Sequence, residues 1–157
     1  MILKPTSDLA LAAGRFTIFL AGSIEMGTAT DWQERIAVEL SDVDNICLLN
    51  PRRDDWDASW KQEKSNAIFN EQVSWELNGL ERSDLIVYYF SPETKSPVTL
   101  LELGLFARSG KVIVCCPEGF WRKGNVDIVC ERFGIQQVDN LEGLMREVRM
   151  IVTSKTQ

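Results

Sequence analysis

The chain has 157 residues, of which 45% are hydrophobic and 25% are charged, and these values are ordinary for one globular domain. Its 23 acidic and 17 basic residues give a net charge of −6, which argues against a general electrostatic attraction to nucleic acid or to an anionic membrane. The absence of histidine excludes Ser-His-Asp and Cys-His catalysis and every histidine metal site.

Strands and helices are expected to alternate along the chain. The predicted strands are 15–21, 45–50, 84–90, 111–116 and 135–138, and the predicted helices are 31–40, 66–83, 97–110, 126–134 and 141–152. Continuous apolar strands of this kind predict a parallel sheet that is covered by helices on both faces. We therefore expect an α/β fold with a doubly wound, five-stranded parallel sheet in the flavodoxin-like order 2-1-3-4-5.

The chain ends and the cysteines predict a cytoplasmic protein with one domain over residues 1–157. Residues 1–14 combine a short apolar run with a proline, so we interpret them as an N-terminal extension and not as a signal peptide. No apolar run reaches the roughly 18 residues of a membrane span. The four cysteines form no CxxC pair, which predicts buried thiols and no metal site.

In a doubly wound fold, ligands bind beyond the carboxyl ends of the strands. Gly22, Ser23 and Ile24 follow the first predicted strand, where the glycine permits a tight turn and the serine can offer a hydroxyl and N–H groups to an anion. Arg52 and Arg53 follow the second strand. They are either ligand contacts or surface arginines that pair with the acids at positions 54 and 55.

Glu102 lies inside the apolar segment "SPVTLLELGLF". Burying a carboxylate without a partner costs free energy, so Glu102 is expected to have either an interaction partner or a functional role. Thr99 and Glu102 match a capping box, whereas Ser96 followed by a proline is an equally good helix start that puts Glu102 in the second turn. The leucines around Glu102 predict that both faces of this helix are buried, and Gly104 predicts a close approach to the sheet.

Three further residues stand out before and after this helix. Glu76 precedes the third predicted strand and is either an ordinary surface glutamate or a site residue. Trp75 belongs either to the core or to a platform for a nucleobase. Phe120 and Trp121 are expected in an exposed loop together with Asn125, and exposed aromatic residues of this kind suit an interface.

These segments resemble the nucleoside 2-deoxyribosyltransferase superfamily, and most closely its nucleoside 2-deoxyribosyltransferase-like branch. The resemblance covers roughly residues 15–150, and it rests on "FLAGSI", "LNPRRDDW", "WELNGLERSDLIVYYF" and "SPVTLLELGLFARSGKVIV". The last two are the specific ones, because an acid, "LNGL", an aspartate that opens the third strand and "ELG" in the next helix form a spaced constellation.

The resemblance implies roles for the acids. Glu102 falls on the nucleophilic glutamate of the family. Glu76 falls on the acid that binds or protonates the nucleobase, although the family usually has an aspartate there. Asn125 matches an asparagine that, in transferases, reaches the active site of a neighbouring subunit, which implies a homodimer or a higher homo-oligomer.

Contacts to the sugar are also implied by the resemblance. Ser96 falls where transferases carry an acid that holds the 5′-hydroxyl group and where related nucleotide hydrolases carry a serine near a 5′-phosphate. Those hydrolases tend to have an arginine where this chain has Glu25. A phosphate would therefore need the positive charge of Arg52 or Arg53.

The implied activity is cleavage of the N-glycosidic bond of a nucleoside or nucleotide, by hydrolysis or by transfer of the sugar to another base, with no cofactor. This chemistry needs two carboxyl groups and no histidine. The alternative is a non-catalytic nucleotide-binding or nucleotide-sensing module of the same fold. The fold by itself also suggests a flavodoxin-like protein that binds FMN.

Overall fold

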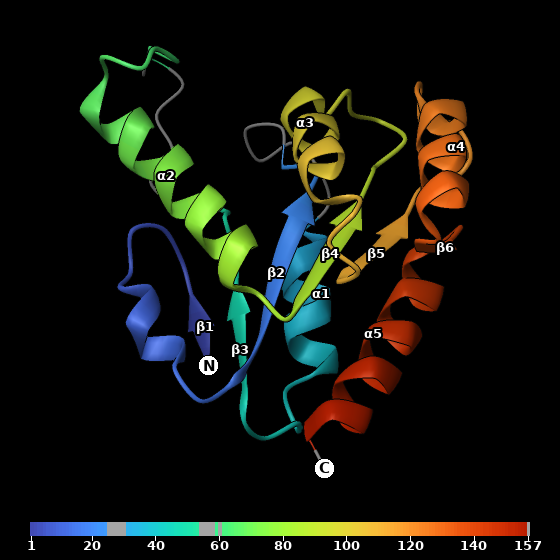
Figure 1. Ribbon diagram of the computed structural model, residues 1–157, viewed down its shortest axis with the longest axis horizontal. Coiled ribbons are helices and arrows are strands. Elements are labelled where there is room, and N and C mark those ends of the chain that lie inside the picture. The colour runs from blue at the N-terminus through green and yellow to red at the C-terminus, as the bar shows by residue number, and fades with distance from the viewer. Residues whose placement is uncertain (25–30, 54–58, 60, 157) are drawn as a thin grey trace.

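A computed structural model describes residues 1–24, 31–53, 59 and 61–156 of the chain. Its described residues form one parallel sheet of six strands in the order β1-β3-β2-β4-β5-β6 (Figure 1). The strands are β1 (Ile2–Leu3), β2 (Phe16–Gly22), β3 (Ile46–Leu49), β4 (Leu85–Tyr89), β5 (Val112–Cys115) and β6 (Gln136–Val138). The helices are η1 (Leu9–Ala12), α1 (Trp32–Glu39), α2 (Ala67–Arg82), α3 (Pro97–Phe106), α4 (Lys123–Phe133) and α5 (Leu141–Thr156).

The expected count of five strands is wrong, because the N-terminal segment adds a strand to the sheet. Ile2 pairs with Leu48 and Leu3 pairs with Leu49, so β1 forms the edge beside β3. The five strands that the sequence predicts follow one another in the expected succession beyond that edge. A strand of two residues has no periodicity of its own, and its pairing with β3 is what defines it.

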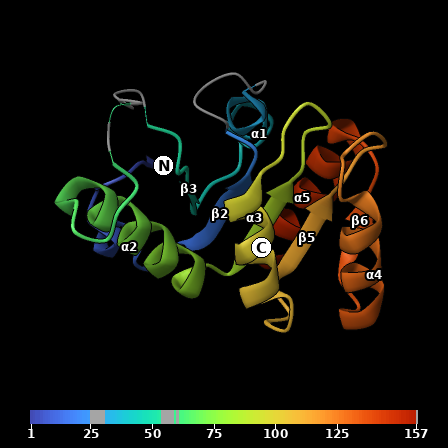
Figure 2. The ribbon, with the colours of Figure 1, turned by 90° about the horizontal axis from the view of Figure 1, so that it is seen from above.

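Helices cover both faces of the sheet. Figure 2 shows α2, α3 and α4 on one face and α1 and α5 on the other. Each face has its own apolar core, and alternate residues of β2 supply both: Phe19 packs under α2, whereas Ile18 packs on the side of α1 and α5. Cys115 and Cys116 likewise enter opposite cores, as the sequence predicts, and all four cysteines are free and buried.

The helix that approaches the sheet closely is α2, and the glycine that permits this is Gly79. A Cβ atom at Gly79 would lie 2.8 Å from the ring of Phe19 and 3.3 Å from Leu49. Gly104 of α3 has no atom within 4 Å of the corresponding position. The expected role of Gly104 is therefore wrong, because this residue faces away from the sheet.

Helix α3 begins at Pro97, with Ser96 at the N-cap. Thr99 is therefore inside the helix, and the capping-box interpretation of Glu102 is wrong. The expectation that both faces of α3 are buried is also wrong. Glu102 and Leu103 are buried, but the opposite face exposes three apolar side chains to between 59% and 64%, namely Val98, Leu101 and Leu105.

Candidate active site

Two glutamates on helices of the same face form an unusual pair of carboxyl groups. Glu102 of α3 is 8% exposed, and Glu76 of α2 is half-buried. Burial raises the pKa of Glu102 to about 8, and the charge of Glu76 acts in the same direction. Burial also raises the pKa of Glu76 to about 7. The two groups therefore titrate as a coupled pair near neutral pH, as acid and nucleophile pairs in enzymes do.

Gln72 holds the carboxylate of Glu76 from one helical turn away. Its Nε2 donates to Oε1 of Glu76 at 2.6 Å and to the carbonyl oxygen of Pro51 at 3.3 Å. The bond to Glu76 favours the ionised form and so opposes the effect of burial on the pKa of Glu76. Oε1 of Gln72 is buried without a hydrogen-bond partner among the described residues, so this acceptor is available to a group of a ligand.

Glu102 has no comparable support. Among the described residues, none donates a hydrogen bond to its carboxylate, and the one charge that shifts its pKa is the like charge of Glu76. A buried carboxylate in that situation destabilises the fold. In the free protein, a proton shared by the pair therefore favours Glu102 over Glu76.

Three hydroxyl groups meet where β2 ends and α3 begins. Oγ of Ser23 lies 2.7 Å from Oγ1 of Thr94 and 2.6 Å from Oγ of Ser96, and the latter two atoms are 2.8 Å apart. The backbone N–H of Ser91 donates to Oγ of Ser23 at 2.9 Å. All three hydroxyl residues are buried. Because each hydroxyl can donate or accept, this cluster can adapt to a polar group of a ligand.

Helix α3 connects the hydroxyl cluster to the carboxyl pair. Ser96 takes the N-cap in the left-handed conformation with φ 44°, and its side chain makes no capping bond to α3. The first turn of α3 therefore presents N–H groups and a partial positive charge beside the cluster. The structure thus joins Ser23 to Ser96 by a hydrogen bond and holds Glu76 within electrostatic range of Glu102, and α3 carries or adjoins one residue of each pair.

Gly22 is required by packing. A Cβ atom there would lie 2.6 Å from the carbonyl oxygen of Tyr89 and 2.7 Å from the ring of Trp32. Only a glycine lets β2 end between these two groups and deliver Ser23 to the cluster. Ile24 is half-buried directly after Ser23.

The two arginines after β3 are half-buried. Nε of Arg52 lies 3.6 Å from Oδ2 of Asp31, the residue at the N-cap of α1. Arg52 therefore links the end of β3 to the start of α1. The pairing of Arg52 and Arg53 with the acids at positions 54 and 55 falls outside the described residues.

Two of the aromatic residues that the sequence singles out are buried, Trp75 by the first of its two interpretations and Phe120 against expectation. Trp75 is 6% exposed, packs against Phe19 and donates its Nε1–H to the carbonyl oxygen of Ser7 at 2.9 Å. It is a core residue and has no free face for a nucleobase. Phe120 is also buried, 5.0 Å from the ring of Phe90, so the expectation of an exposed Phe120 is wrong.

Trp121 and Asn125 are exposed as expected. Trp121 is 50% exposed and donates its Nε1–H to the carbonyl oxygen of Lys95 at 2.9 Å. Asn125 lies in the first turn of α4 and not in a loop, because α4 begins three residues earlier than predicted, at Lys123.

The comparisons with known proteins fit this arrangement. Residues 15–120 match the family described as "Nucleoside 2-deoxyribosyltransferase like". The chain belongs to this family. Membership suggests glycosyl transfer. The match ends before Asn125, so the role of that residue is not part of it.

The solved structures extend the likeness to most of the fold. A protein described as "conserved protein from Enterococcus faecalis V583" superposes with a TM-score of 0.61, at 15% identity, over 87% of this chain and 98% of its own. At that identity the likeness concerns the fold alone. No curated protein matches the chain.

Two residues of the family-like motif before β4 serve packing in this nucleoside 2-deoxyribosyltransferase-like protein. Oδ2 of Asp84 accepts a hydrogen bond from the backbone N–H of Thr17 at 2.8 Å, and the backbone N–H of Asp84 donates to the carbonyl oxygen of Thr17 at 2.8 Å. These bonds join the starts of β2 and β4. Together with the close approach at Gly79, they fix where α2 and its Glu76 lie.

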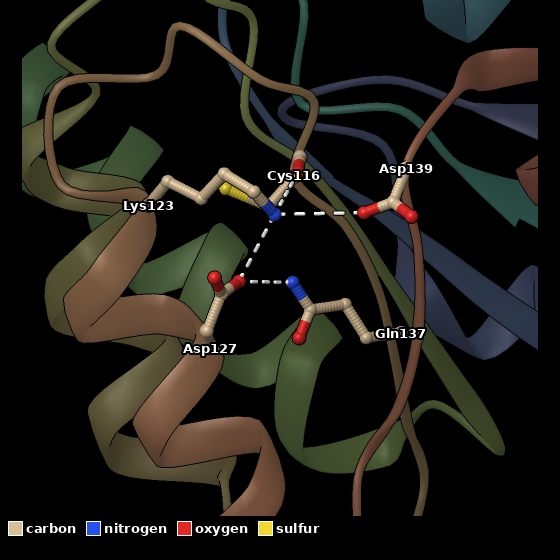
Figure 3. A network of polar contacts seen from close by, with 5 residues as sticks. All are labelled: Cys116, Lys123, Asp127, Gln137 and Asp139. Carbon is tan, nitrogen blue, oxygen red and sulfur yellow. Dashed lines mark hydrogen bonds and ion pairs between the residues drawn. The ribbon is translucent and has the colours of Figure 1, made fainter.

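A second polar network fixes the start of α4, next to Asn125 (Figure 3). Nζ of Lys123 donates to the carbonyl oxygen of Cys116 at 3.0 Å and contacts Oδ1 of Asp127 at 3.2 Å and of Asp139 at 3.5 Å. Gln137 donates to the same Oδ1 of Asp127. Side chains from α4, from β6 and from the segment after β6, together with the backbone carbonyl of Cys116 after β5, thus hold the first turn of α4 against the sheet.

Two polar residues of this arrangement, Gln72 and Thr94, were not predicted from the sequence. Gln72 could have been found, because it lies four residues before Glu76 and so on the same helix face. Thr94 lies in a loop, and no sequence signal marks it.

Other features of the described chain do not compete with this site. A shallow depression of about 620 Å³ lies along α5, lined by residues such as Met145 and Arg149, but it contains no pair of buried acids. Within the described ranges, no group of three or more Cys, Asp and Glu side chains could hold a metal ion. In that part of the chain, no helix has the length and apolar character needed to cross a membrane.

Proposed function

We propose that this protein cleaves the N-glycosidic bond of a nucleoside or nucleotide, with Glu102 as the nucleophile and Glu76 as the acid. The observation that carries the proposal is the state of Glu102. It is buried, no described residue donates a hydrogen bond to it, and the like charge of Glu76 helps to raise its pKa. A structural carboxylate would be capped or paired, and Glu102 is neither.

The reaction would run in two balanced steps. First, an Oε atom of ionised Glu102 attacks C1′ of the sugar while the C1′–N bond breaks. The bond's electron pair goes to the nucleobase, which takes a proton from Glu76. A water molecule or a second base then attacks C1′ and gives its proton to Glu76, and Glu102 leaves. Both routes retain the configuration at C1′.

The substrate groups can be assigned to the carboxyl pair and to the hydroxyl cluster. The nucleobase would lie near Glu76 and Gln72, whose unsatisfied amide oxygen can accept a hydrogen bond from it. The 5′ side of the sugar would contact the cluster around Ser23 and Ser96. The half-buried side chains of the sequence-predicted set complete the proposed surroundings, namely Ile24, Arg52 and Arg53.

The composition of the site supports carboxylate chemistry without a cofactor. The four free cysteines support the cytoplasmic setting that we propose, because thiols persist in a reducing compartment. All four are buried, and burial raises the pKa of Cys47, Cys115, Cys116 and Cys130. Protonated, buried thiols do not compete with Glu102 as nucleophiles.

The exposed face of α3 supports a homo-oligomer. Val98, Leu101 and Leu105 repeat at helical spacing and are all more than half exposed, and apolar stripes of this kind mark interfaces. Asn125 is exposed on α4, which covers the same face of the sheet. We propose that Asn125 of one subunit approaches Glu102 of its partner.

Incubation of the protein with a panel of nucleosides and 5′-nucleotides tests the activity. Free base, separated by chromatography, is the readout, and a second base in the mixture distinguishes transfer from hydrolysis. A comparison of each nucleoside with its 5′-monophosphate shows whether the site uses a phosphate. Saturable binding without release of base would favour the nucleotide-sensing alternative and contradict the proposal.

A further inference from the structure

The hydroxyl of Tyr88 is a buried polar group that the proposed mechanism does not use. Tyr88 lies in β4, where it is paired with Ala21 of β2 and Val114 of β5, and it is 0% exposed. Its ring stacks on Phe90 at 6.3 Å. The hydroxyl has no hydrogen-bond partner among the described residues.

Tyr88 and Glu102 lie on the same side of the sheet. Both belong to the face of the sheet that α2, α3 and α4 cover, and Tyr88 shares its apolar core with Leu103, the neighbour of Glu102. Burial raises the pKa of Tyr88, and the charge of Glu102 raises it further. The phenol and the carboxylate therefore lie within electrostatic range of each other.

The needs of the two groups are complementary. An unpaired buried hydroxyl and an unpaired buried carboxylate each carry a desolvation penalty. A tyrosine hydroxyl can donate a hydrogen bond, and an ionised glutamate can only accept. In the structure the two groups are not hydrogen-bonded to each other, so a bond between them requires the flexible side chain of Glu102 to rotate.

We propose that the Tyr88 hydroxyl is the positioning donor for Glu102, and that it donates a hydrogen bond to the Glu102 carboxylate when that carboxylate is ionised. This inference rests on the proposed role of Glu102 as the nucleophile. The Tyr88 hydroxyl would supply a hydrogen-bond donor for the Glu102 carboxylate. Gln72 already favours the charge on Glu76, whereas no described residue favours the charge on Glu102. A donor at Glu102 shifts the shared proton to Glu76, where the leaving base needs it.

The groups that face Glu102 make this assignment specific. Glu76 of α2 opposes the ionisation of Glu102 by its like charge. Gln72 is already engaged with Glu76 and Pro51. From the sheet below, Tyr88 brings the hydroxyl, whereas the neighbouring Tyr89 lies on the opposite face, 5.5 Å from the ring of Trp32.

The test is Tyr88→Phe, with Tyr89→Phe as the matched control on the other face of the same strand. We expect Tyr88→Phe to lower kcat about 10- to 100-fold, as loss of a hydrogen bond to a charged group does, with little change in KM. The acid limb of the pH–rate profile should move to higher pH, because Glu102 becomes harder to ionise. The melting temperature should stay the same or rise, because an unsatisfied hydroxyl disappears. Tyr89→Phe should keep the wild-type kcat and profile.

A second readout separates this inference from the proposed activity. Titration of the Glu102 carboxyl carbon by ¹³C NMR, assigned with Glu102→Gln, reports the pKa of Glu102 without any substrate. A higher pKa in Tyr88→Phe than in the wild type supports the pair even if the wild type releases no base, an outcome that would defeat the proposed function alone. If the wild type releases base, an unchanged pKa of Glu102 together with an unchanged kcat in Tyr88→Phe would overturn the inference. If the wild type releases no base, an unchanged pKa of Glu102 would be enough to overturn it.

Discussion

Glu102 of α3 and Glu76 of α2 are electrostatically coupled, so that the charge of Glu76 raises the pKa of Glu102. The coupling is asymmetric in its surroundings, because Glu76 accepts a hydrogen bond from Gln72 and no described residue donates to Glu102. Carboxyl pairs in different environments can divide the roles of acid and nucleophile. Here the free protein favours the proton on Glu102, and the proposed hydrogen bond from Tyr88 would reverse that order and leave the proton on Glu76. The predictions below follow from this pair and from the helices that hold it.

Replacement of Glu102 should abolish the proposed activity. We expect Glu102→Ala to reduce base release by about three orders of magnitude or more, because the covalent step and its electrostatic stabilisation are lost together. Glu131→Gln, at an exposed position of α4, should release base at the wild-type rate. Unchanged turnover with a lowered melting temperature would return Glu102 to a purely structural role.

The buried pair should make stability depend on pH. In the unfolded chain both carboxyl groups titrate near pH 4.3, whereas in the folded protein the pKa of Glu76 is about 7 and that of Glu102 is about 8. Between these values the folded state binds more protons than the unfolded state. The contribution of the pair to the free energy of unfolding is therefore largest below about pH 4 and is lost as the pH rises through 7 to 8.

Glu102→Gln isolates this effect, because the amide has the same shape and no charge. We expect it to match the wild type near pH 4 and to exceed the wild-type free energy of unfolding by about 5 kcal/mol near pH 9, at about 1.4 kcal/mol for each unit between the unfolded pKa near 4.3 and the folded pKa of about 8. Urea unfolding at the two pH values measures the difference. A variant that is less stable than the wild type at pH 9 would contradict the raised pKa of Glu102.

Helix α2 should depend on Gly79 for its position. A Cβ atom there would meet the ring of Phe19 at 2.8 Å, and Phe19 is itself buried. We expect Gly79→Ala to destabilise the protein by about 1–3 kcal/mol, as overpacking does. At Gly124 of α4 a Cβ atom would meet nothing within 4 Å, so Gly124→Ala should be neutral or should stabilise by up to about 1 kcal/mol. Equal effects of the two variants would show that α2 can move away from the sheet without cost.

The exposed stripe on α3 should mediate assembly. Leu101 is 64% exposed, and Leu101→Glu would bury a charge in the proposed interface. We expect the wild type to be oligomeric by light scattering and Leu101→Glu to be monomeric. Val38→Glu on α1 is the matched control, since Val38 is also 64% exposed but lies on the other face of the sheet. A monomeric wild type would contradict the proposed interface.

Complementation tests whether Asn125 acts on the neighbouring subunit. Asn125→Ala and Glu102→Gln should each lack most activity. After unfolding and refolding as an equal mixture, about a quarter of the sites in a two-fold dimer would combine an intact Glu102 with an intact Asn125 of the partner. Recovery of about that share of the base release supports action in trans. No recovery, with both variants assembled, would mean that Asn125 acts within its own subunit or not at all.

Most of the helices and strands, and the acids proposed for the site, could be predicted from the local sequence. Short apolar runs such as 84–90, bounded by polar residues, favour buried strands. Their alternation with helices predicts a parallel sheet, and the predicted succession of these strands is present. Glu102 stood out because a carboxylate in an apolar segment is costly. The start of its helix at Ser96 and Pro97 could also be predicted, because proline is favoured at the first helical position.

The tertiary structure decided which faces of the elements are buried and which residues meet. Trp75 and Phe120 are aromatic residues of the kind that often contact ligands or other subunits. Packing against Phe19 and Phe90 nevertheless puts them in the core. The hydrogen bond between Ser23 and Ser96 and the electrostatic coupling of Glu102 with Glu76 link residues far apart in the chain. Such contacts depend on how strands are paired and on how closely α2 and α3 approach the sheet. These distances are set by long-range packing and cannot be predicted from local sequence.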